Sequence, residues 1–214
     1  MGRKAAQGVR HHHAAPAAAP PAGPAGTVPP VIDHIATRDK VVFLTYDLDG
    51  DHPGARGLAA LVREKRLPLS VFLARPATRS GPLARLRALG ADIENRTFTR
   101  ASLPGLGYVA QHTQICAQQD SVAGRFGRAP RLLRPPEGGF DAATLRAAAA
   151  CGIEAIVLWT HEAPDPPHLH LHLRLHPGDI IKVGGGRRPA DTTATLLREI
   201  RSQGYEVAHL NAYL

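Results

Sequence analysis

Short apolar runs alternate with longer amphipathic segments along most of this chain, and this alternation constrains its fold more than any other feature. The apolar runs are typical of buried strands, and the amphipathic segments are typical of helices that end near a glycine. Strands that alternate with helices build βαβ units around a parallel sheet. The predicted strands span residues 41–46, 69–74, 91–95, 131–134, 154–159, 179–183 and 206–210, and the predicted helices span 55–66, 83–89, 106–126, 142–151 and 192–203.

Seven strands are fewer than the eight of a closed (β/α) barrel. We therefore predict an α/β fold, either an incomplete or distorted (β/α) barrel of parallel strands or an open sheet. In both architectures the functional side chains lie just beyond the carboxyl ends of the strands. The segments that meet this condition are residues 47–52, 96–100, 134–140, 159–165 and 184–188.

The first thirty residues differ in composition from the rest of the chain. His11, His12 and His13 are followed by a stretch of alanine, proline and glycine. Such a segment buries too little apolar surface to offset the entropy lost on ordering. We predict a disordered arm over residues 1–30 and one domain over 31–214. No apolar region follows the basic residues at the start, so no signal peptide is visible.

The net charge of +8 comes mostly from arginine and favours acidic partners. The chain has no dense block of lysine and arginine interleaved with aromatic residues, so specific nucleic-acid binding is not expected. No apolar run reaches the ~18 residues that a membrane span requires. A span is therefore not expected either.

Five segments at the predicted strand ends resemble, in the same order, motifs of the polysaccharide deacetylases, the NodB-homology domain of carbohydrate esterase family 4. The resemblance covers residues 33–214. The segments read Thr45-Tyr46-Asp47-Leu48-Asp49-Gly50, Asn95-Arg96-Thr97-Phe98-Thr99-Arg100, Arg134-Pro135-Pro136-Glu137-Gly138, Val157-Leu158-Trp159-Thr160-His161 and Ile180-Ile181-Lys182-Val183-Gly184.

This resemblance implies a hydrolase that removes N- or O-acetyl groups from glycans such as chitin, peptidoglycan and xylan. It implies one metal ion, usually zinc or cobalt, held by one aspartate and two histidines. It also implies a second aspartate as catalytic base, which Asp47 matches, and a late histidine as catalytic acid. A location outside the cell or in the cell envelope would follow from the same resemblance.

The positions that the resemblance implies for metal and acid are altered. The metal-binding aspartate aligns with Leu48, or with Asp49 in relatives that use an Asp-x-Asp form. Both histidine positions hold arginine, Arg96 and Arg100, and a guanidinium has no lone pair to give a metal. Gly184 stands where the acid histidine is implied. We expect a dismantled metal site, with Asp49 the ligand if a metal binds at all.

The resemblance also implies supporting residues. Arg134 is expected to orient Asp47, although a buried pair of this kind is equally a structural device. Trp159 lines the acetyl pocket or is a core aromatic. Glu137 replaces an aromatic residue that would stack on a sugar. The loop 184–188 combines glycines with two arginines and is a weak candidate for cradling an anion.

Two further features have no counterpart in the family motifs. Histidines alternate with leucines over residues 167–176, which indicates an edge strand with a polar face or a set of metal ligands. Cys116 and Cys151 are the only cysteines and are predicted on adjacent helices, facing one another or the sheet. Whether they are bridged depends on the compartment.

Three functions remain open. We expect an inactive member of the family, without a cofactor, that binds a glycan or an anionic small molecule. One alternative is an active hydrolase with a rebuilt site that holds zinc or cobalt, and another is a non-catalytic module that binds a wall polymer. The candidate binding residues are Arg96, Arg100, Glu137 and His161, and the rebuilt site would use Asp47, Asp49, His52 and His161.

Overall fold

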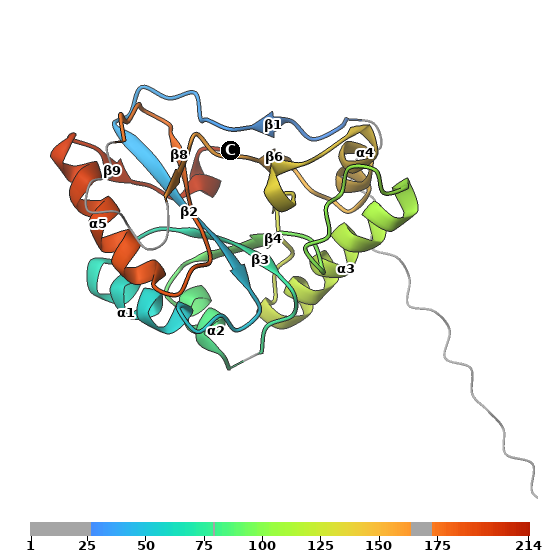
Figure 1. Ribbon diagram of the computed structural model, residues 1–214, viewed down its shortest axis with the longest axis horizontal. Helices are drawn as coiled ribbons and strands as arrows, with labels where there is room; N and C mark the ends of the chain where they lie inside the picture. Colours follow the sequence, from blue (N-terminus) through green and yellow to red (C-terminus); the bar gives the residue numbers. More distant parts are fainter. Residues whose placement is uncertain (1–26, 79, 164–172) are drawn as a thin grey trace, which may run out of the picture.

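The structure is a computed structural model and describes residues 27–78, 80–163 and 173–214. Eight strands form one curled sheet in the order β1-β6-β5-β4-β3-β2-β8-β7, and β9 pairs with the beginning of β2 (Figure 1). The strands are β1 (Val31–Ile32), β2 (Val41–Asp49), β3 (Ser70–Ala74), β4 (Asp92–Asn95), β5 (Leu132–Leu133), β6 (Ala155–Val157), β7 (His161–Ala163), β8 (Ile180–Val183) and β9 (Glu206–Val207).

The helices cover the outside of this sheet. Helix α1 packs between α2 and α5, whereas α3 packs against α4 and β4 (Figure 1). An open, curled parallel sheet with outer helices confirms the predicted incomplete barrel. The helices are α1 (Ala55–Lys65), α2 (Pro82–Ala88), α3 (Tyr108–Phe126), α4 (Ala142–Ala150) and α5 (Pro189–Ser202), with 3-10 turns η1 (Pro136–Gly138) and η2 (Leu210–Ala212).

All seven predicted strands form, and the structure adds two short ones, β1 and β7. Strand β1 has two residues after a proline-rich stretch, and only one of the three residues in β7 is buried. Strand β1 is only two apolar residues long and β7 is short and mostly polar, so periodicity gave no signal for them. Their position at the two edges of the sheet explains why they need so little apolar sequence.

Strand β2 separates two environments, because successive side chains of a strand point to opposite faces. Tyr46 and Leu48 are buried in the apolar core that the sheet forms with α1 and α5. Phe43 belongs to the second core, on the inner face of the curl. By the same alternation, Asp47 and Asp49 share the inner face with Phe43, and Leu48 does not.

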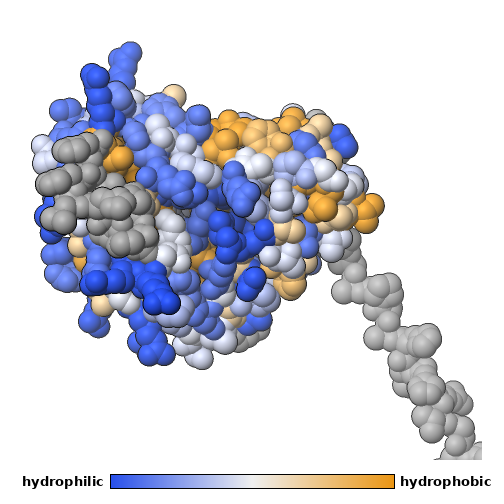
Figure 2. Space-filling view, in the orientation of Figure 1, coloured by the Kyte–Doolittle hydropathy of each residue, from blue (hydrophilic) through white to orange (hydrophobic). Residues whose placement is uncertain are grey.

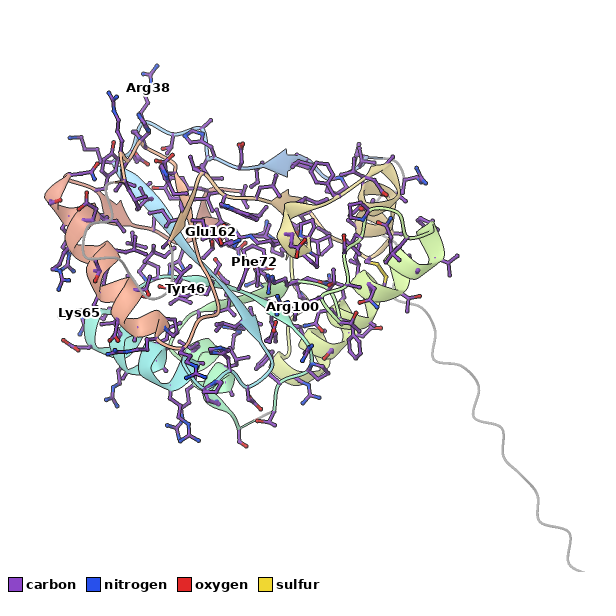
Figure 3. The ribbon with its side chains drawn as sticks, viewed as in Figure 1. Arg38, Tyr46, Lys65, Phe72, Arg100 and Glu162 are labelled. Carbon is purple, nitrogen blue, oxygen red and sulfur yellow. A yellow bond between two sulfur atoms is a disulfide. The ribbon has the colours of Figure 1, made fainter. Side chains whose placement is uncertain are left out.

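A disulfide joins α3 and α4, the two helices that cover the part of the sheet around β4, β5 and β6. Cys116 lies on α3 and Cys151 follows α4, with their Cα atoms 5.2 Å apart, and the bond is drawn in yellow in Figure 3. The predicted placement on adjacent helices is confirmed. The sequence did not decide whether the two cysteines form a disulfide, and in the structure they do.

Two predictions fall wholly or partly outside the described residues. They are the N-terminal arm, up to residue 26, and the alternating histidine segment over residues 167–172. The described remainder of that segment, residues 173–176, forms no strand. None of the helices in the described part of the chain is long and apolar enough to cross a membrane.

Glu94 is a buried carboxyl that ties the end of the chain to the sheet. Its side chain accepts hydrogen bonds from the backbone amides of Arg131 and Leu132, each at 2.8 Å, and from the Asn211 side chain at 2.8 Å. Burial raises the pKa of Glu94 to about 7, although these hydrogen bonds oppose the rise. The folded protein therefore holds a proton here that the unfolded chain releases at lower pH.

We expect stability to fall as pH rises from about 4.5 to about 7, because the folded state binds more protons than the unfolded state in this window. The contribution of Glu94 is at most about 3 kcal/mol. Urea unfolding at several pH values across this range gives the free energy of unfolding as a function of pH. This free energy should depend less on pH in Glu94→Gln, whereas Glu206→Gln, at an exposed carboxylate, should keep the pH dependence of the unmodified protein. An unchanged slope in Glu94→Gln would assign the dependence to another group.

Candidate functional site

A cavity of about 240 Å3 lies at the carboxyl ends of the central strands, where parallel sheets place their functional groups. Figure 3 labels two of its residues, Arg100 and Glu162, in the central part of the molecule. A larger hollow of about 470 Å3 lies at the amino ends of β3 and β9 and is lined mainly by apolar and basic side chains. The cavity residues are Asp47, Asp49, His52, Arg96, Arg100, Glu162, Lys182, Gly184 and Gly185.

The deepest charged group next to this cavity is Arg134, which is fully buried. Its Nη1 donates to Asp47 Oδ1 at 3.1 Å and to Thr45 Oγ1 at 2.9 Å. Nε and Nη2 donate to the carbonyl oxygens of Val157 and Leu158, at 3.1 and 3.0 Å. Burial lowers the pKa of the guanidinium and Asp47 opposes this, so Arg134 stays charged with an acceptor for each nitrogen.

From Arg134 outward, positive and negative side chains alternate. Arg96 Nη2 lies 3.1 Å from Asp47 Oδ2, and its Nη1 lies 3.6 Å from Asp49 Oδ1. Arg100 Nη1 then donates to Asp49 Oδ2 at 2.6 Å. The exposed fraction of the side chains rises along this series, which we call the charge chain: Arg134 0%, Asp47 4%, Arg96 10%, Asp49 27% and Arg100 45%.

The loop that carries Arg96 and Arg100 is held in a strained backbone by its neighbours. Thr97 and Arg100 have φ values of 65° and 64°, in the left-handed region. Asn95 Oδ1 accepts from the Thr97 amide at 2.8 Å, and Gln114 Oε1 accepts from the Thr99 amide at 2.9 Å. These bonds fix the direction in which both arginines enter the cavity.

Lys182 and Glu162 were missed by the sequence analysis. Lys182 Nζ lies 2.8 Å from Glu162 Oε1 and 3.7 Å from the centre of the Trp159 ring. The sequence feature that could have identified Lys182 is its position as the one charged residue in the otherwise apolar strand β8. Trp159 also lies near the Arg134 guanidinium, 5.6 Å from its ring centre, so cations stand close to the ring on two sides.

Three other predicted positions have definite places. His161 Nε2 lies 3.0 Å from Asp179 Oδ2, at the amino end of β8, and His161 is not a cavity residue. Glu137 also lies outside the cavity lining, exposed on η1 with a φ of 56°. A Cβ at Gly184 would meet no atom within 4 Å, whereas a Cβ at Gly185 would stand 2.5 Å from the Asp47 carbonyl oxygen. The cavity therefore has room for a side chain at 184 but not at 185.

The alternation along β2 decides between the two candidate carboxylate positions. Leu48 is fully buried among the helix-facing apolar side chains, and Asp49 faces the cavity. Asp47 and Asp49 are thus the carboxylates available to a ligand on the inner face.

A divalent cation does not fit these residues. Both carboxylates are already paired with guanidinium groups, and Arg96 stands between them. At 4 Å, each arginine would repel a divalent cation by about 8 kcal/mol at an effective dielectric constant near 20. His52, the histidine among the cavity residues, already accepts at Nδ1 from the Gly54 amide at 3.1 Å. The metal that the sequence resemblance implies has no matching ligand set here.

Arg134→Met is expected to lower the free energy of unfolding by about 3–5 kcal/mol, because it removes a buried charge partner from Asp47. Arg100→Met breaks a half-exposed pair and is expected to cost about 1 kcal/mol or less. Urea unfolding of both variants measures the difference. Equal losses would contradict the view that the buried end of the charge chain stabilises the fold.

Comparisons with known proteins agree with the family that the motifs resemble. The sequence pattern of the polysaccharide deacetylases matches residues 34–156. An uncharacterised protein of Streptomyces coelicolor is 43% identical over 223 aligned positions, which span 99% of this chain and 88% of the relative.

Solved structures share the fold at lower identity. A family 4 carbohydrate esterase from Bacillus anthracis has a TM-score of 0.73 at 19% identity, covering 85% of this chain and 86% of its own. The chitin deacetylase of the fungus Colletotrichum lindemuthianum has a TM-score of 0.75 at 19% identity, with 88% and 93% covered. A family 4 pseudoenzyme from Bacillus anthracis has a TM-score of 0.73 at 16% identity, with 87% and 69% covered. A mutant of this pseudoenzyme with restored enzymatic activity has a TM-score of 0.72 at 18% identity. The match covers 87% of this chain and 72% of the mutant.

Proposed function

Because the chain belongs to the polysaccharide deacetylase family, we propose that it is a member that binds an acetylated glycan without removing the acetyl groups. The observation that carries this proposal is the position of Arg96, whose guanidinium lies between the carboxylates of Asp47 and Asp49. The family is typically metal-dependent, and this arginine takes the place of the cation in neutralising both carboxylates.

Two further features support the loss of catalysis. Gly184 offers no side chain to protonate a leaving group, although it lines the cavity. Asp47 is held between two guanidinium groups, one on each carboxylate oxygen, so neither oxygen is free to take a proton from an attacking water. Without a metal or an acid, none of the described groups beside the cavity both activates water and stabilises an oxyanion.

The charges around the cavity favour a neutral, polar ligand. Among the side chains that line the cavity there are three carboxylates, Asp47, Asp49 and Glu162, and three cations, Arg96, Arg100 and Lys182. Each of these cations lies within 4 Å of a carboxylate, and the further positive charge of Arg134 is fully buried behind Asp47. The anionic small molecule expected from the arginines alone is therefore not supported. Figure 2 shows hydrophilic residues over the middle of the molecule. A neutral sugar with hydroxyl and amide groups matches this lining.

Hydrogen-bonding capacity remains beside the cavity for such a ligand. Asp49 Oδ1 and Arg96 Nε are buried and have no hydrogen-bond partner among the described residues. Both atoms are covered by their neighbours, so a ligand reaches them only when the Asp49 and Arg96 side chains shift. A hydroxyl group could then donate to Asp49 Oδ1, and an acetamide oxygen could accept from Arg96 Nε. Leaving such atoms unpaired costs about 1–3 kcal/mol each, so satisfying them would favour binding.

N-acetylglucosamine oligomers are expected to bind the unmodified protein, as measured by NMR titration, and to release no acetate, with or without added zinc. Asp49→Asn should weaken binding about tenfold or more, because a hydrogen bond to a charged group contributes about 1.5–3 kcal/mol. Glu206→Gln, on the surface strand β9, should bind as the unmodified protein does. Absence of binding would refute the glycan ligand, and acetate release that a chelator abolishes would favour the rebuilt hydrolase.

Restoring the implied ligands should restore zinc-dependent deacetylation. The triple change Arg96→His, Arg100→His and Gly184→His keeps Asp49 as the carboxylate ligand. Histidine tolerates the left-handed backbone at position 100, and the space at position 184 is open. Activity should appear only with zinc, and the matched triple change to glutamine should stay inactive. A zinc-loaded but inactive histidine triple would contradict the view that ligand loss alone removed catalysis.

A further inference from the structure

A second cluster of metal-ligating side chains lies away from the cavity, between α3 and α4. His112 and Cys116 are one turn apart on α3 and share a helix face. Cys151, at the end of α4, is bonded to Cys116, and the disulfide is visible between the two helices in Figure 3. The ligand atoms of these three side chains all lie within 4.8 Å of one another. None of the three lines the cavity.

The distance between the His112 and Cys116 ligand atoms matches zinc geometry. A tetrahedral zinc ion with Zn–S bonds of about 2.3 Å and Zn–N bonds of about 2.0–2.1 Å holds its ligand atoms about 3.5–3.8 Å apart. His112 Nε2 already lies 3.5 Å from Cys116 Sγ. The three side chains are partly buried and supply three ligand atoms, so water or a small ligand would have to supply the fourth.

The disulfide decides whether this cluster binds metal. While Cys116 and Cys151 are bonded, their sulfurs offer no thiolate. Reduction separates the sulfurs, and the 5.2 Å between the two Cα atoms lets the side chains turn apart while the helices stay packed.

We propose that His112, Cys116 and Cys151 form a redox-controlled zinc site, closed by the disulfide and opened by its reduction. A dithiol or small thiol supplies two electrons and two protons to the disulfide and is itself oxidised to a disulfide. The two cysteine thiols then bind Zn2+ with release of two protons, and neutral His112 supplies the third ligand. In each state a cross-link, either the disulfide or the metal, joins α3 to α4.

Cobalt titration tests this site, because Co2+ bound to thiolate gives a charge-transfer absorption that histidine-only sites lack. The protein is reduced with a phosphine and titrated with Co2+, then with Zn2+. The reduced form should develop the thiolate band with one equivalent of cobalt and lose it to zinc, and the oxidised form should show no such band. Histidines elsewhere, including His11–His13, are present in both forms and cannot produce the difference.

Variants separate the proposed ligands from bystanders. His112→Ala should weaken cobalt binding about tenfold or more while two thiolates remain. Cys116→Ser should lose most of the band, and His209→Ala, at an exposed histidine, should match the unmodified protein. An unchanged affinity in His112→Ala would overturn the proposed ligand set. Loss of the native circular dichroism on reduction, not recovered with zinc, would overturn the site itself.

Discussion

The buried pair between Arg134 and Asp47 is the interaction on which the rest of the structure depends. One guanidinium binds side chains of β2 and carbonyl oxygens at the end of β6, and its carbon lies 4.1 Å from the centre of the Phe72 ring on β3. Arg134 itself follows β5, so this side chain joins four strands inside the curl. A charge in this position is tolerated because each of its nitrogens has an acceptor, and truncating it would strand several partners at once.

The charge chain extends this pair to the surface. Arg96 belongs both to the buried part of the charge chain and to the cavity, because it pairs with the buried Asp47 and also approaches Asp49 at the cavity. Its environment explains how a fold whose relatives depend on a metal cation can keep two carboxylates side by side. In the function proposed above, the fixed cations Arg96 and Arg100 take the place of the metal ion, and they need no ligand geometry from their neighbours.

Much of the fold could be predicted from the sequence, because most of these strands contain short apolar runs and helices α2 to α5 end close to a glycine. The edge strands β1 and β7 could not, since they have only two and three residues. At the site, Arg96 and Arg100 were identifiable from their motif. The choice between Leu48 and Asp49 required knowing which face of β2 each side chain occupies. Lys182 was identified as a site residue only from the structure, in which its ammonium group lies over the Trp159 ring.

The charge chain also has a consequence for how such a site changes over generations. Each internal member faces two opposite charges, so a substitution that removes one member alone leaves its neighbours unbalanced in a poorly solvated place. The penalty falls on stability before any new activity can be gained. Because the effects of these substitutions depend on one another, replacing one arginine of the charge chain at a time passes through less stable proteins. A sequence that carries these arginines therefore tends to keep them.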